Sequence, residues 1–227
     1  MDNNQDFKMN LLITASYYVW WFFLGNFYFA LLNLPLMVLI LGLGTGILVS
    51  PSVWFIALCC IPLGPSITSL MGAMGKVVVD KDVHLTKQLF KTYKNSFKQS
   101  TIIWSVMLAI LTMLYVDAAY FSAKGNVLAY LFYIVLVYVL VLSLYSLSII
   151  SGFYLKTSKI VGVAFGYSFT HFKVTMINVL TLIAAAYIFT SFTSYSVLFL
   201  SSIFCYCLMH NNQPILKDIK ERLENAA

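Results

Sequence analysis

The side chains best placed to bind a ligand lie in residues 87–99, KQLFKTYKNSFKQ. Lys87, Lys91, Lys94 and Lys98 follow one another at intervals of four, three and four residues, which puts them on one face of a helix. Ammonium groups in such a row bind anions, and near a membrane surface each lysine contributes about 1 kcal/mol toward anionic lipid. The spacing therefore predicts a surface for anionic lipid or for the docking of a soluble partner.

A second stripe on the same stretch is apolar. It contains Leu85, Leu89, Phe90, Tyr93 and Phe97, well separated from the lysines at the angular spacing of a helix. We therefore predict an amphipathic basic helix over residues 83–99, with Asp82 at its cap position. Its apolar face would lie in the headgroup boundary or against other helices. Two interpretations remain open: the lysines only set membrane topology, or they also dock a partner through Phe90, Lys91, Tyr93, Lys94, Phe97 and Lys98.

A similar pattern occurs later in the chain. AFGYSFTHFKVTMINVLTLI (164–183) resembles LFKTYKNSFKQSTIIWSVML (89–108) at a constant offset of 75 residues. Phe97-Lys98 then corresponds to Phe172-Lys173, which makes Phe172 and Lys173 further candidates for partner or lipid contact. The correspondence predicts an internal repeat of two helical hairpins, an arrangement found in transporters.

The residue types that serve enzymes and metals do not form recognisable sites. His84, His171 and His210 have no companions at metal-ligand spacing, and the cysteines come as Cys59-Cys60 and Cys205-x-Cys207. Nucleotide-binding, zinc-protease and serine-hydrolase signatures are missing from the sequence. We expect no enzymatic activity, no metal and no cofactor.

Polar residues inside apolar segments are the remaining candidates for function. Asp117, in LTMLYVDAAYF, is expected near the outer end of a membrane span, either as an interface anchor or as part of a polar path. Asn33 interrupts an apolar block, and Asn26, Asn33 and Asn178 are expected to hydrogen-bond between helices.

The elements that position these residues are membrane helices. Hydrophobic residues make up 61% of the 227 residues and charged residues 10%, with a mean hydropathy of +0.87, whereas ordinary soluble domains are about 45–50% apolar and about 25% charged. We predict an all-α polytopic bundle in one domain, residues 1–227, with short amphipathic helices beside it. The predicted spans are 19–44, 52–75, 100–121, 127–154, 175–191 and 194–209, the second broken at Pro62, Gly64 and Pro65.

The basic residues predict the orientation of this bundle. With these spans, thirteen of the fourteen lysines and arginines fall on one side and Lys124 alone on the other. Positive charge marks the cytoplasmic side of a membrane. Both termini of the chain are therefore expected on the cytoplasmic side of the cell membrane. The outer loops are then too short for an extracellular domain. Nucleic-acid binding is not expected, because the basic residues follow the topology and no soluble domain is present to form a groove.

Four segments together resemble the YesL-like family of bacterial membrane proteins. They are NFYFALLNLPLM (26–37), IPLGPSITSLMGAMGKVV (61–78), LTKQLFKTYKNSFKQS (85–100) and LYVDAAYFS (114–122). The sequence departs from the family pattern at Ser66, where alanine is usual, and at Lys91, where an aromatic residue is common. The resemblance implies a multi-pass protein of the plasma membrane of Gram-positive-type bacteria, whose genes accompany carbohydrate ABC importers.

Three functions fit these observations. The first is an accessory or regulatory subunit that packs against the permease of a carbohydrate ABC importer. The second is a stand-alone small-solute transporter or channel, favoured by the broken span and the repeat. The third is a membrane sensor or assembly factor without transport. The sequence leaves the sugar, the partner and the oligomeric state open.

Overall fold

A computed structural model describes residues 3–80, 84–191 and 193–225, with side chains for 16–80, 84–191 and 199–225. These residues form ten helices and no strand, which confirms the all-α prediction. The helices are α1 (Asn3–Leu32), α2 (Leu34–Gly44), α3 (Val53–Cys59), α4 (Leu63–Asp80), α5 (Leu85–Ala123), α6 (Leu128–Gly152), α7 (Thr157–Thr170), α8 (Phe172–Ser191), α9 (Thr193–Asn211) and α10 (Gln213–Glu224). Asp82, the expected cap residue, lies outside the described residues.

Four helical segments are long and apolar enough to cross a membrane: Val53–Asp80, Leu85–Ala123, Leu128–Gly152 and Phe172–Ser191. They contain or closely match the second to fifth predicted spans. The first predicted span corresponds to a pair of helices, Ser16–Leu32 and Leu34–Gly44, that meet at 87°. The sixth, 194–209, lies within α9, where the side chains of its first residues are outside the described part.

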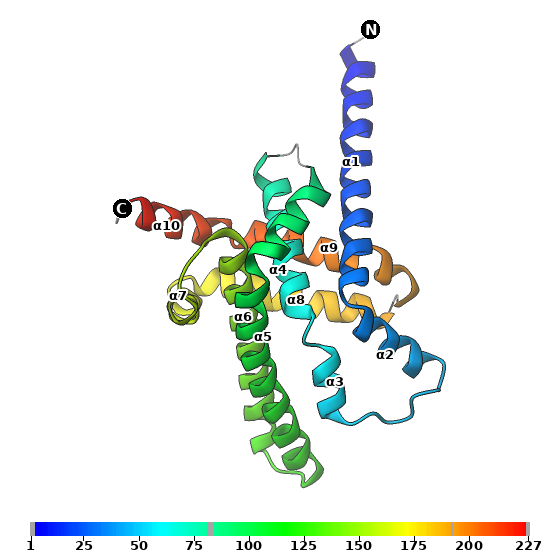
Figure 1. The fold of residues 1–227 in the computed structure, drawn as a ribbon, viewed down its shortest axis with the longest axis vertical. Helices are drawn as coiled ribbons and strands as arrows, with labels where there is room; N and C mark the ends of the chain where they lie inside the picture. The colour runs from blue at the N-terminus through cyan, green and yellow to red at the C-terminus, as the bar shows by residue number, and fades with distance from the viewer. Residues whose placement is uncertain (1–2, 81–83, 192, 226–227) are drawn as a thin grey trace.

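The centre of the bundle is α4, which packs against α1, α5, α6 and α9 (Figure 1). Leu70, Met71, Ala73 and Met74 of α4 are fully buried. Small residues allow the close packing: a Cβ atom on Gly72 would lie 2.7 Å from the Thr92 side chain of α5. The core therefore lies where α4 meets its neighbours.

The α5–α6 hairpin extends away from this core (Figure 1). Residues 141–150 of α6 are buried, whereas most of residues 128–137 are exposed, including Tyr130, Leu131 and Ile134. Phe121 and Phe132 stack across the hairpin with ring centroids 5.4 Å apart. Large apolar side chains exposed on this scale are stable in lipid and would cause aggregation in water.

One element differs from its prediction. The amphipathic helix expected over 83–99 is not a separate interfacial helix, because α5 runs without interruption from Leu85 through Ala123. The face that it buries contains Leu85, Leu89, Thr92, Ser96 and Ser100, while Phe90 and Phe97 are 42% and 46% exposed. The small hydroxyl residues turn inward because they allow close contact with α4, so the aromatic rings face outward.

The two copies of the predicted repeat also differ locally. The first copy lies within the continuous helix α5, whereas the second is divided at His171 into α7 and α8. At that division the hydroxyl of Thr175 donates a hydrogen bond to the carbonyl of Ser168 at 2.8 Å. The separate helices α7 and α10 agree with the prediction of short helices beside the bundle.

Candidate functional site

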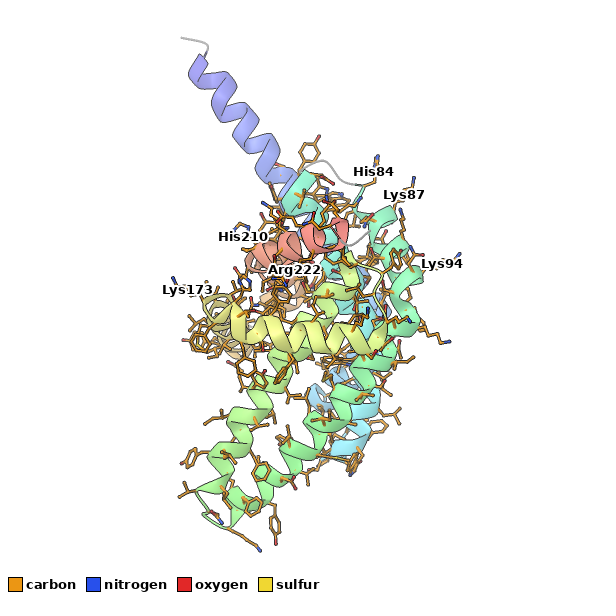
Figure 2. All side chains as sticks on the ribbon, turned by 90° about the vertical axis from the view of Figure 1, so that its left-hand side faces the viewer. His84, Lys87, Lys94, Lys173, His210 and Arg222 are labelled. Carbon is orange, nitrogen blue, oxygen red and sulfur yellow. The ribbon has the colours of Figure 1, made fainter. Side chains whose placement is uncertain are left out.

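The basic side chains labelled in Figure 2 lie in one part of the molecule. His84, Lys87, Lys94, Lys173, His210 and Arg222 all lie in the upper half of Figure 2, away from the tip of the α5–α6 hairpin. Lys124 occupies that tip, where its ammonium lies 4.2 Å from the centroid of the Tyr120 ring. Lys124 thus lies apart from the labelled residues, and the side of a membrane that each group faces stays a prediction.

Six residues of α5 form a ridge on the outward side of this helix. We call it the α5 ridge and define it as Phe90, Lys91, Tyr93, Lys94, Phe97 and Lys98. Tyr93 and Phe97 are neighbours with ring centroids 5.3 Å apart, and Phe90 meets Tyr28 of α1 edge to face at 5.2 Å. All three lysines are exposed. The ridge therefore presents aromatic and cationic groups together on one rigid helix.

Phe172 and Lys173, the matching residues of the second copy, begin α8. Both are exposed, and Phe172 is 60% accessible. They lie on a different helix from the α5 ridge.

Behind the ridge lies a cavity of about 610 Å³ among α4, α5, α6, α9 and α10, which we call the inner cavity. Four lysines from three helices line it: Lys76, Lys91, Lys217 and Lys220. Asp80 is the acidic residue among the lining side chains. Of these four, Lys91 could be singled out from the sequence and the other three could not, because only the fold brings α10 beside α4 and α5.

The wall and floor of the inner cavity are neutral. Gln88 donates to the hydroxyl of Thr92 at 3.3 Å, and Asn95 donates to the hydroxyl of Tyr154 at 2.8 Å. Deeper in, Gly75 allows Met209 to approach so closely that a Cβ atom there would lie 2.5 Å from the methionine methyl group. The lining therefore combines exposed lysines and neutral polar side chains with an apolar part at the buried Met209.

The predicted helix break before α4 lies beside Asn33. The contact is made through Ser66 of α4, which is 33 residues from Asn33 in the sequence. The break comprises Cys60, Ile61 and Pro62; Gly64 and Pro65 are in the first turn of α4, where a proline costs no hydrogen bond. Asn33, fully buried between α1 and α2, donates through Nδ2 to the hydroxyl of Ser66 at 2.7 Å. The side chain of Trp104 donates to the carbonyl of Cys60 at 2.8 Å. The two breaks in the helices are thus joined.

Other predicted polar contacts between helices are present as well. Asn26 of α1 accepts a hydrogen bond from the backbone of Ser201 in α9 at 3.1 Å. Asn178 of α8 donates to Asn212 at 2.8 Å, and Asn212 donates to Ser148 of α6 at 3.2 Å. Asp117 is exposed near the outer end of α5.

A last polar cluster fixes α10 against α7. The Tyr167 hydroxyl donates to the carboxylate of Asp218, which also contacts Arg222 at 3.1 Å. Burial, followed by the hydrogen bond to Asp218, raises the pKa of Tyr167 to about 12. The hydrogen bond from Tyr167, together with Arg222, lowers the pKa of Asp218. Both shifts favour the protonation states that hold α10 in place at neutral pH.

Residues 20–118 match the model of a family described as a protein of unknown function, DUF624. This part of the chain includes the break at Asn33, the break at Pro62 and the α5 ridge. No curated protein and no solved structure matches the chain. Within the described residues, no group of three histidine, cysteine or acidic side chains is arranged to hold a metal ion.

Proposed function

We propose that this protein is an accessory membrane subunit that packs against the permease of a carbohydrate ABC importer in a bacterial plasma membrane. The importer association comes from the resemblance to the YesL-like family, with which the match over residues 20–118 is consistent. The observation that carries the contact is the exposure of the α5 ridge. Exposed aromatic rings are enriched at protein interfaces, and the lysines beside them provide positive charge that complements an acidic partner surface.

The continuity of α5 supports this function. Because no break separates residues 85–99 from the apolar part of the helix, a partner bound to the ridge is mechanically linked to the membrane half. A separate interfacial helix would move independently. An accessory subunit of this kind therefore influences a permease by contact, without chemistry of its own.

The test is affinity purification of the tagged protein from its own host in a mild detergent, followed by mass spectrometry. We expect permease subunits in near-stoichiometric amounts, and we expect Lys94→Glu with Lys98→Glu to reduce their recovery. The matched control is Lys156→Glu with Lys159→Glu, which changes the same charge at the N-terminal end of α7, outside the ridge. Reporter fusions at the C-terminus check that each variant keeps its topology. Equal recovery from the ridge variant and the wild type would refute the proposed contact.

A stand-alone transporter is the second candidate, and the joined breaks favour it. Broken helices supply backbone polar groups within the membrane that must face protein or a cavity. Purified protein in liposomes that carries a sugar across the membrane without an ATPase would decide for this function. A lack of flux, together with permease recovery in the purification, would decide for the accessory role.

A further inference from the structure

The inner cavity is separate from the α5 ridge, with Lys91 as the residue common to both. Its lysines come from the consecutive helices α4 and α5 and from the distant α10, so the fold surrounds one space with positive charge from both parts of the chain. Like charges placed around one cavity repel each other, and this arrangement is favourable when an anion occupies the space.

The carboxylates of the described residues leave this charge largely unbalanced. Lys220 forms an exposed ion pair with Glu224 at 3.8 Å, and Asp218 pairs with Arg222. Among the described residues, Lys76, Lys91 and Lys217 have no carboxylate within 4.0 Å. With Asp80 as the acidic lining residue, the rim carries a net positive charge.

We propose that the inner cavity binds a phosphate group, carried either by a small phosphorylated molecule or by the headgroup of an anionic lipid. Lys76, Lys91 and Lys217 bind the phosphate oxygens. Gln88, Asn95 and Gln213 of the wall hydrogen-bond the polar remainder of the ligand, and the floor at Gly75 and Met209 takes an apolar part. The site lies at the predicted cytoplasmic surface, where both sources of phosphate are available.

Setting the topology does not by itself explain this arrangement. Lysines that only mark the cytoplasmic side serve equally well anywhere on that surface, including positions outside the cavity such as that of Lys94. Lys91 and Lys94 belong to the same helix, and both are exposed, yet Lys91 lines the cavity. This pair gives a matched comparison in which the same charge is removed inside and outside the site.

The experiment uses the purified full chain without any importer subunit, so that its result is independent of the proposed function. In the soluble arm, inorganic phosphate and glycerol 3-phosphate are titrated into the protein in neutral detergent by calorimetry. In the lipid arm, the protein is placed in nanodiscs of phosphatidylcholine with a minor fraction of phosphatidylglycerol, and retained lipid is counted by native mass spectrometry. Thermal unfolding of every variant confirms that it is folded.

We expect Lys91→Gln, Lys76→Gln and Lys217→Gln each to weaken binding about fivefold, corresponding to about 1 kcal/mol for each phosphate-facing lysine. Lys94→Gln is expected to bind like the wild type. Binding in the soluble arm identifies a small phosphorylated molecule, and retention in the lipid arm alone identifies a lipid headgroup. Binding in neither arm, or equal weakening by Lys94→Gln and Lys91→Gln, would overturn the proposal.

Discussion

The hydrogen bond between Asn33 and Ser66 predicts an unusual ranking of substitutions. The two N–H groups of Asn33 are both used, one on the carbonyl of Phe29 at 2.8 Å and one on Ser66 at 2.7 Å. Its Oδ1 atom, in contrast, is buried and has no hydrogen-bond partner in the described structure. Ser66 in turn donates to the carbonyl of Pro62 at 2.8 Å.

Ser66→Ala removes the acceptor and leaves a buried N–H of Asn33 unpaired, which costs about 1–3 kcal/mol of unfolding free energy. Asn33→Leu keeps the shape of the side chain and removes the unpaired oxygen together with both N–H groups. The carbonyl of Phe29 still accepts from the Asn33 backbone, and Ser66 still donates to Pro62. Replacement of a partly satisfied polar group by an apolar isostere is close to neutral, so we expect a cost under about 1 kcal/mol.

Adding Ser66→Ala to Asn33→Leu is then expected to cost less than Ser66→Ala costs alone. The coupling is expected to fall near the 0.6 to about 1.7 kcal/mol measured for hydrogen bonds between membrane helices. Unfolding of the four proteins in mixed micelles, followed by circular dichroism, measures it. Thr45→Ala is the control, because this exposed hydroxyl bonds only to carbonyls of its own helix. Additive costs, or a larger loss from Asn33→Leu than from Ser66→Ala, would show that the two breaks are not joined in this way.

Three further predictions concern other contacts. Gly64→Ala places a Cβ atom 2.4 Å from that of Trp104 and is expected to destabilise the fold by about 1–3 kcal/mol, whereas Gly162→Ala, with nothing within 4 Å, is expected to be neutral or slightly stabilising in the same unfolding assay. Trp104→Phe removes the hydrogen bond to Cys60 and is expected to cost about 1 kcal/mol; a variant as stable as the wild type would contradict that role. The contact between α7 and α10 is expected to weaken at both extremes of pH. Asp218, whose pKa is lowered, stabilises the fold above about pH 4 and loses this effect in more acidic solution. Tyr167, whose pKa is raised to about 12, stabilises the fold below about pH 10 and loses this effect as the pH rises through 12. Tyr167→Phe should abolish the alkaline loss in thermal unfolding, and an unchanged alkaline profile would refute the assignment.

The helices and their order could be predicted from the sequence because long apolar segments have few stable alternatives in a membrane. The breaks could be predicted as well, since Asn33 and Pro62 stand within apolar blocks. The proximity of the two breaks could not be predicted, because it depends on how α1 and α4 pack. An asparagine in an apolar segment does not specify its hydrogen-bond partner. The inner cavity could not be predicted for the same reason, because Lys217 of α10 is far in the sequence from Lys76 and Lys91.

The orientation of the α5 ridge shows where the pattern of apolar residues is misleading in a membrane protein. In water, the apolar stripe of an amphipathic helix turns inward, because burial removes it from the solvent. In α5, close packing against α4 favours small side chains over part of the contact between the two helices, while Leu85 and Leu89 of the apolar stripe still turn inward. Thr92, Ser96 and Ser100 accordingly face the core, while Phe90 and Phe97 remain outside.

The continuity of α5 follows from the same reasoning about local structure. The charge ends near residue 99, which suggested a boundary between two elements, but neither glycine nor proline occurs between Leu85 and Ala123. A change in polarity marks where a helix leaves the membrane surface and does not end it. Because the helix is uninterrupted, Lys91 in the inner cavity and the apolar residues beyond 100 belong to one rigid element. Binding of a phosphate at the cavity and contact of a permease with the ridge would therefore act on the same helix. If the occupied cavity holds α5 in a different position against α4, each binding event would change the affinity of the other.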